Sequence, residues 1–158
     1  MVMAIITLQA GENHSKTLKD LNITLEIISL KEWEKITNVV PEGTMETEKY
    51  CQKLGSPKKS RQELEEYILN STIIDPNASG KYGIWQCDYV GKIKVWNKVW
   101  DFWSVSGLTR LSRKVDASHN PINENFEMYC HEGECYETIY LVCNSNACSP
   151  IATEADGV

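Results

Sequence analysis

At 158 residues, the chain has the length of one domain that can bury a sizeable hydrophobic core. Its composition, 42% hydrophobic and 24% charged, is ordinary for a globular protein. The net charge of −6 disfavours nucleic acid as a partner, because binding to the phosphate backbone needs a basic surface. No apolar run reaches the roughly 18 residues of a membrane span. We therefore expect one globular domain over residues 1–150, a flexible tail over 151–158, and another protein as the partner.

The first half of the chain predicts strands followed by short helices. The segments 3–9 and 23–30 are β-like, and the capping-box pattern Ser29–Glu32 predicts a helix over about 30–38. A second helix is expected over 45–54, ending at Gly55. The capping box Ser60–Glu63 then predicts a helix to about Asn70, with its apolar face formed by Leu64, Tyr67 and Ile68. The composition of "IIDPNASGKYG" predicts a loop.

Residues 83–107, "GIWQCDYVGKIKVWNKVWDFWSVSG", hold four of the five tryptophans. Trp96, Trp100 and Trp103 recur at helical spacing, but β-branched and aromatic residues dominate and no helix cap precedes them. We therefore expect a meander of short strands, with turns at Gly91-Lys92 and Asn97-Lys98. Trp85 and Trp103 are predicted to be buried.

Four of the six cysteines lie in "CHEGECYETIYLVCNSNAC", residues 130–148. The strand-like run between Cys135 and Cys143 would hold those two residues about 26 Å apart, too far to share one zinc ion. A hairpin with the four-residue loop "HEGE" would instead bring Cys130 opposite Cys135, and Cys143 and Cys148 flank "NSNA" in the same way. Disulfides are the favoured interpretation, with Cys51 and Cys87 completing an even set. Free thiols, or zinc-bound thiolates, are the alternatives.

Together these segments predict an α+β fold. It would have N-terminal strands, two or three short central helices, and a C-terminal antiparallel β-meander or hairpin stabilised by disulfides.

A binding face is suggested by interleaved lysines and aromatic residues. An unbroken strand would place Lys94, Trp96, Lys98, Trp100 and Phe102 on one face, where they could stack bases or sugars. The competing interpretation, which we favour, has tryptophans in the core and lysines in solvent, so that Lys94 and Lys98 are exposed. The basic cluster Arg110, Arg113 and Lys114 could meet an acidic partner.

Catalytic patterns are sparse. His131 lies beside Glu132 and Glu134, but a solvated turn explains the three residues better than an acid–base set does. There is no phosphate-binding loop, nucleophile motif or C-x-x-C. We predict no catalytic residue, no metal and no cofactor.

Four N-x-S/T sequons favour export, at Asn13, Asn22, Asn70 and Asn77. The opening "MVMAIITLQAG" lacks the basic flank of a signal peptide. The leading hypothesis is a secreted, disulfide-stabilised, non-enzymatic protein that binds another protein, of the pathogen or viral host-interaction type. The alternatives are a small nuclease or nucleic-acid binder using the lysine and tryptophan face, and an intracellular viral or regulatory protein with reduced or zinc-bound cysteines.

Overall fold

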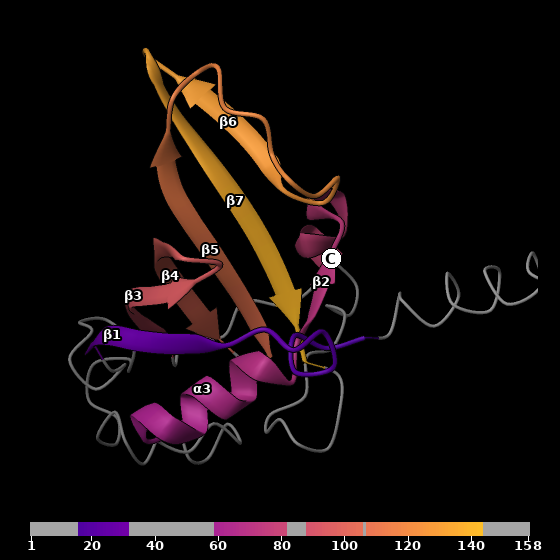
Figure 1. Cartoon of the computed structure of the whole chain (residues 1–158), viewed down its shortest axis with the longest axis vertical. Helices are drawn as coiled ribbons and strands as arrows, with labels where there is room; N and C mark the ends of the chain where they lie inside the picture. The colour runs from indigo at the N-terminus through magenta and orange to yellow at the C-terminus, as the bar shows by residue number, and fades with distance from the viewer. Residues whose placement is uncertain (1–15, 32–58, 82–87, 106, 144–158) are drawn as a thin grey trace, which may run out of the picture.

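A single antiparallel sheet dominates the fold. The computed structural model describes residues 16–31, 59–81, 88–105 and 107–143, and Figure 1 shows them in colour. Seven strands pair in the order β1-β3-β4-β5-β7-β2, with β6 beside the upper part of β7. Their bounds are β1 Leu25–Lys31, β2 Thr72–Ile74, β3 Tyr89–Val95, β4 Lys98–Val105, β5 Leu108–Val115, β6 Glu127–His131 and β7 Glu134–Val142. An α-helix, α3 (Arg61–Leu69), and a 3-10 helix, η2 (Pro76–Lys81), complete the elements.

The expected α+β class is therefore wrong for this part of the chain, which is mainly antiparallel β with one α-helix. The helix predicted over about 30–38 is wrong at its first two residues, because β1 continues through Lys31. The rest of that range lies outside the described residues. Ser29, the supposed N-cap, lies in β1, and its hydroxyl accepts a hydrogen bond from the Lys92 N–H at 3.2 Å. The expected strand at 3–9, the helix at 45–54 and the tail at 151–158 lie outside the described residues. No helix within the described ranges has the length and apolar character needed to cross a bilayer.

The helix α3 begins and ends as its sequence predicts. The Ser60 hydroxyl accepts from the Glu63 N–H at 3.1 Å, and the Glu63 carboxylate accepts from the Ser60 N–H at 3.3 Å. Such a reciprocal cap satisfies two N–H groups that a helix start otherwise leaves unpaired. Asn70 forms the C-cap, and Leu64, Tyr67 and Ile68 are buried as expected. The local sequence therefore predicts the start, the end and the buried face of α3 correctly.

The strands β3 and β4 form a hairpin whose turn differs from the predicted ones. Trp96 and Asn97 have φ of 52° and 58°, the left-handed conformation that a two-residue turn of this kind requires at both positions. Gly91, predicted to turn, instead lies inside β3. A Cβ on Gly91 would stand 2.0 Å from the carbonyl oxygen of Ser29, where the register of β1 shifts. The glycine therefore serves the close approach of β1 rather than a turn.

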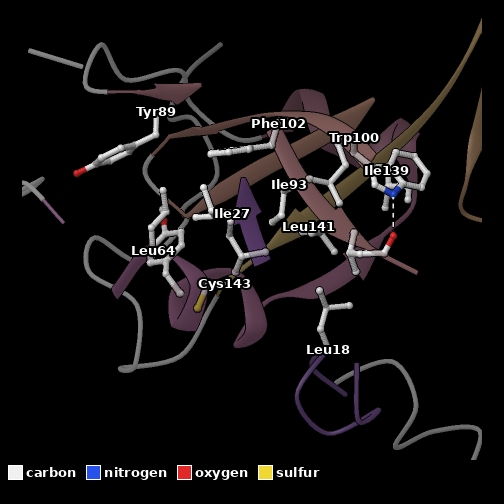
Figure 2. Packing of buried hydrophobic residues seen from close by; sticks show 14 of the residues in the cluster. Leu18, Ile27, Leu64, Tyr89, Ile93, Trp100, Phe102, Ile139, Leu141 and Cys143 are labelled. Carbon is white, nitrogen blue, oxygen red and sulfur yellow. Dashed lines mark hydrogen bonds between the residues drawn. The ribbon is translucent and has the colours of Figure 1, made fainter. Parts of the chain in front are cut away.

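One face of the sheet carries the main hydrophobic core, and α3 packs on it (Figures 1 and 2). The close-up shows side chains from β1, β3, β4, β7 and α3 meeting between the helix and the sheet. The members with no more than 1% exposure include Leu18, Ile27, Leu64, Ile68, Ile93, Leu111, Ile139 and Leu141. At about 25 cal/mol per Å² of apolar area removed from water, such a set is the main stabilising term of a small domain.

Above α3, strands β5 and β7 extend with β6 into what we call the arm, residues 113–138 (Figure 1). The connection 116–126 runs from the end of β5 to β6, which lies on the far side of β7. Phe126 at its end is 6% exposed and contacts the rings of Trp96 and Trp100, with centroids 5.4 and 6.4 Å away. This connection therefore covers part of the face that α3 does not reach.

The tryptophans are distributed differently from the prediction. Trp100 is buried, 2% exposed, and its Nε1–H donates to the Val95 carbonyl at 3.1 Å, the dashed line in Figure 2. Trp103, predicted to be buried, is only half-buried because it is one step out of phase with Trp100 and faces the other side of β4. Trp85 lies outside the described residues.

Candidate functional site

The sheet face opposite α3 carries a row of side chains, which we call the open-face row. Val90, Trp103, Arg110, Tyr140 and Ile74 are direct cross-strand partners on β3, β4, β5, β7 and β2. Directly opposed residues in an antiparallel sheet project to the same side, about 5 Å apart. Arg110 is exposed and the other four are half-buried. The row therefore places an exposed arginine between two half-buried aromatic side chains, which pack against the buried Leu108 and Val142.

The centre of the row is held in place by specific contacts. The Trp103 Nε1–H donates to the Asp88 carboxylate at 2.6 Å, which fixes the indole ring. The Arg110 guanidinium carbon lies 5.3 Å from the Trp103 ring centroid, within the range of a cation–π interaction. Arg110 has no carboxylate within ion-pair distance among the described residues. Its charge is therefore oriented by an aromatic ring and not neutralised by an acid.

A depression of about 420 Å³ lies beside this centre. Its lining is Ser29, Val90, Gly91, Lys92, Asp101, Phe102, Trp103, Arg110 and Ser112. Lys92 and Asp101 at its border form an exposed ion pair at 2.8 Å, which leaves both charges largely compensated. Arg110 is thus the cation at this depression whose charge remains available to a bound molecule.

The predicted lysine and tryptophan face does not form. The chain turns at Trp96 and Asn97, so Lys94 and Lys98 lie on different strands, both exposed as expected. Trp100 and Phe102 are buried at 2% and 3% exposure, and Trp96 is half-buried against Phe126. Neither Trp100 nor Phe102 therefore presents a free stacking surface. The prediction that Trp100 and Phe102 belong to the core is confirmed. The continuous strand on which the lysine and tryptophan face depended is interrupted by the turn at Trp96 and Asn97.

The predicted basic cluster is also divided, because neighbouring residues on β5 point to opposite faces. Arg110 lies on the open face, while Arg113 points to the core face and Lys114 is exposed. The Lys114 ammonium lies 3.2 Å from the Glu134 carboxylate, which also accepts from the Tyr136 hydroxyl at 2.8 Å. The Tyr136 hydrogen bond and then Lys114 lower the pKa of Glu134, and the same hydrogen bond raises the pKa of Tyr136.

A second polar cluster, on the core face of the arm, was missed by the sequence analysis. The Glu137 side chain is only 3% exposed, and its two oxygens lie 3.0 Å from Arg113 Nε and 2.7 Å from His119 Nε2. The Arg113 guanidinium also sits 5.1 Å from the Trp100 ring centroid. Because both carboxylate oxygens are occupied, the cluster ties the connection 116–126 to the sheet. The sequence did contain one signal of this cluster. Glu137 alternates with Cys135 and Ile139 along a β-like run, which places a carboxylate on the same face as two apolar residues.

The predicted bridge between Cys130 and Cys135 is confirmed. The two residues are cross-strand partners on β6 and β7, with Cα atoms 4.0 Å apart and a disulfide between them. The loop is shorter than predicted, because Glu132 and Gly133 alone form the turn, both with positive φ. Since these sulfurs are covalently joined, the pair is not available as zinc thiolates. Cys143 is also disulfide-bonded, while Cys51, Cys87 and Cys148 lie outside the described residues.

The turn of this hairpin carries the remaining candidate groups. His131 is exposed, stacks on Tyr129 with 15° between ring planes, and lies 3.6 Å from the Glu132 carboxylate. Across residues 16–31, 59–81, 88–105 and 107–143, no three His, Cys, Asp or Glu side chains gather closely enough to hold a metal ion. The open-face row is therefore the arrangement best suited to contact another molecule. No protein-family model, curated protein or solved structure matches the chain.

Proposed function

We propose that this chain is an extracellular, disulfide-stabilised protein that acts by binding another protein through the open-face row. The observation that carries the proposal is the adjacency of the half-buried Trp103 and Tyr140 to the exposed Arg110 on neighbouring strands of one sheet face. Tryptophan, tyrosine and arginine are the residues most enriched where binding energy concentrates in protein interfaces. A rigid sheet also presents them with little conformational entropy to lose on binding.

The charge of Arg110 defines what the partner presents. A guanidinium without a carboxylate partner favours an aspartate or glutamate, which it can bind through two parallel hydrogen bonds. A hydrogen bond to a charged group contributes about 1.5–3 kcal/mol of net stability. Aromatic rings that flank such a bond exclude water from it. The partner we propose is therefore a protein with an acidic side chain surrounded by apolar contacts.

A protein partner is favoured over nucleic acid by the charge distribution. Lys92 and Lys114, two of the other cations on this side of the sheet, are each paired with a carboxylate. With a net charge of −6, the chain offers few unpaired cations to a run of phosphates. The salt dependence of binding separates the two partners, because phosphate binding weakens steeply with added salt while a single ion pair does so weakly.

The extracellular part of the proposal rests on the disulfides, since such bridges persist in oxidising compartments and are rare in reducing ones. Thiol titration of the protein isolated from its natural source, native and denatured, tests this directly. We expect no free thiol at Cys130, Cys135 or Cys143. A reduced pair at Cys130 and Cys135 in the isolated protein would refute the extracellular assignment.

The binding site is tested by charge reversal with a matched control. The chain is screened against an arrayed set of extracellular protein domains, and each hit is re-measured with Arg110→Glu and Lys98→Glu. Both substitutions change the net charge equally and both positions are exposed. We expect Arg110→Glu to weaken binding at least about tenfold, which is about 1.4 kcal/mol, and Lys98→Glu to leave it nearly unchanged. Equal effects from the two variants would contradict a site at Arg110.

A further inference from the structure

Three of the four sequons lie in the described part of the chain, and their surroundings differ sharply. Asn22 and Asn77 are exposed, and neither side-chain amide has a hydrogen-bond partner within the described ranges. Asn70 is half-buried, and its Nδ2–H donates to the Glu66 carbonyl at 2.8 Å. A sequence reading treats the three as equal candidates. The structure does not.

Asn22 lies at the tip of a turn that leads into β1. Its φ of 59° is in the left-handed region, which asparagine tolerates better than most residues, and its N–H donates to the Lys19 carbonyl at 3.0 Å. The backbone is therefore fixed while the side chain projects outward. Thr24, the hydroxyl residue of this sequon, is also exposed. The backbone conformation explains the asparagine but gives no reason for a threonine two residues later.

Asn77 lies in η2, just beyond the end of β2. Its N–H donates to the Asp75 carboxylate at 2.9 Å, and the Ser79 hydroxyl donates to the Pro76 carbonyl at 2.8 Å. These bonds hold the short helix and leave the Asn77 amide pointing to solvent. A bulky, hydrophilic glycan at this position would displace no described contact.

Asn70, by comparison, has a structural role at the end of α3. It caps α3, and Ser71 beside it is fully buried with its hydroxyl bonded to the Tyr67 carbonyl at 3.1 Å. Leu18 N–H donates to the Ser71 carbonyl, and Thr72 hydroxyl donates to the Val142 carbonyl at 3.3 Å. A glycan on Nδ2 would compete with the hydrogen bond from this amide to the Glu66 carbonyl, which helps to end α3.

We infer that Asn22 and Asn77 are N-glycan acceptors that shield the sheet edges formed by β1 and β2, and that Asn70, whose amide is used at the end of α3, is not an acceptor in the folded protein. The inference rests on the extracellular part of the proposed function. In the strand order, β1 and β2 are the outermost strands, and the two asparagines lie just before β1 and just after β2. Exposed edges are templates for pairing with another chain, and proteins cover them. At Ile27 the edge of β1 is already covered by Glu65 and Arg61 of α3.

The modification is a group transfer from a polyprenyl-diphosphate-linked oligosaccharide. The asparagine Nδ2 attacks C1 of the first sugar, an N-glycosidic bond forms, and the bond between C1 and the diphosphate oxygen breaks. The lipid diphosphate leaves and the amide loses one proton. Neither asparagine belongs to the open-face row, so glycans at these positions are compatible with the proposed binding face.

The test uses the full chain secreted from a eukaryotic cell behind a cleavable signal peptide. Glycans are removed enzymatically in heavy-oxygen water, which marks each formerly occupied asparagine as a labelled aspartate for mass spectrometry. We expect most molecules to be labelled at Asn22 and Asn77 and few at Asn70. Majority labelling at Asn70, or no labelling at both Asn22 and Asn77, would overturn the inference.

The shielding role has its own readout. Thr24→Ala with Asn77→Gln removes the sequons at Asn22 and Asn77. Asn70→Gln removes the sequon at the C-cap of α3 and serves as the control. We expect the double variant to melt like the parent but to associate with rising concentration in light scattering, while the control loses stability without associating. A monodisperse double variant would contradict edge shielding. Labelling at Asn22 and Asn77, together with free thiols in the natural protein, would refute the extracellular assignment and glycosylation of the natural protein, while the difference between these two asparagines and Asn70 would stand.

Discussion

The base of the sheet and its arm bury the same face with different side chains. Beneath α3, the buried residues are apolar, among them Ile27, Ile93 and Leu141. In the arm, the face is closed by the buried pair Arg113 and Glu137, by His119 from the connection, and by the bridge between β6 and β7. The arm is three strands wide where β6 pairs, and no described helix lies over it.

The difference has an energetic consequence. Apolar burial is non-directional, so the base tolerates substitutions that keep volume. A buried ion cluster contributes little over a well-packed apolar set, yet removing one member leaves a charge without a partner. We therefore expect the arm to be sensitive to single substitutions and tolerant of coordinated ones. The following four predictions test that contrast, from the largest effect to the smallest.

Trp100→Ala should have the largest effect, because this ring joins the two regions. It is 2% exposed, contacts Phe126, and carries the Arg113 guanidinium 5.1 Å from its centroid. Emptying such a site costs about 3–5 kcal/mol of unfolding free energy, measured by denaturant titration. Val99→Ala, on the neighbouring exposed position, is the control and should stay within about 0.5 kcal/mol. A loss below about 1 kcal/mol for Trp100→Ala would show that the two regions do not share this core.

Glu137→Ala should destabilise the protein by about 3 kcal/mol, since Arg113 would keep its charge at 18% side-chain exposure without a carboxylate. The triple variant Arg113→Met, His119→Leu, Glu137→Leu replaces the whole cluster by apolar groups. Its stability should return to within about 1 kcal/mol of the parent. Thermal and denaturant unfolding of both variants give the comparison. If the triple variant has a lower free energy of unfolding than Glu137→Ala, the ion cluster itself stabilises the arm.

Cys130→Ser with Cys135→Ser removes the hairpin bridge, which closes only a short loop. The chain-entropy relation for so few residues gives about 2 kcal/mol. We expect the loss to be local, so that amide hydrogen exchange speeds up in β6 and the upper part of β7 and stays unchanged in α3. Uniform acceleration across both regions would mean that the arm and the base unfold as one unit.

Glu134→Gln should have the smallest effect, confined to the surface of the arm. The substitution removes the carboxylate that raises the pKa of Tyr136, so that pKa should fall toward its ordinary value, as followed by NMR titration of the ring. Because the folded-state pKa of Glu134 is lowered, its contribution is present above the unfolded pKa and is lost as pH falls through the folded one. Stability at neutral pH should change little at this exposed position. Glu132→Gln is the control and should leave Tyr136 unaffected.

The sequence by itself determined the elements whose signals are local. The helix α3 follows from the reciprocal cap of Ser60 and Glu63, and its buried face follows from the spacing of Leu64, Tyr67 and Ile68. The bridge between Cys130 and Cys135 follows from a short turn between two β-like runs. In each case, the residues that decide the outcome lie within a few positions of one another, so no distant partner is needed.

Tertiary structure alone decided the register of the strands and the face that each side chain occupies. The sequence around Ser29 predicts a helix cap, but the pairing of β1 with β3 makes it part of a strand. Gly91 is predicted to lie in a turn, but its place in β3 is explained by the close approach of the Ser29 carbonyl. β4 and β7 carry apolar residues on both faces, so their pattern could not show which tryptophan or tyrosine would point inward. The open-face row exists because five strands align residues 74, 90, 103, 110 and 140, and such alignment is a property of long-range pairing.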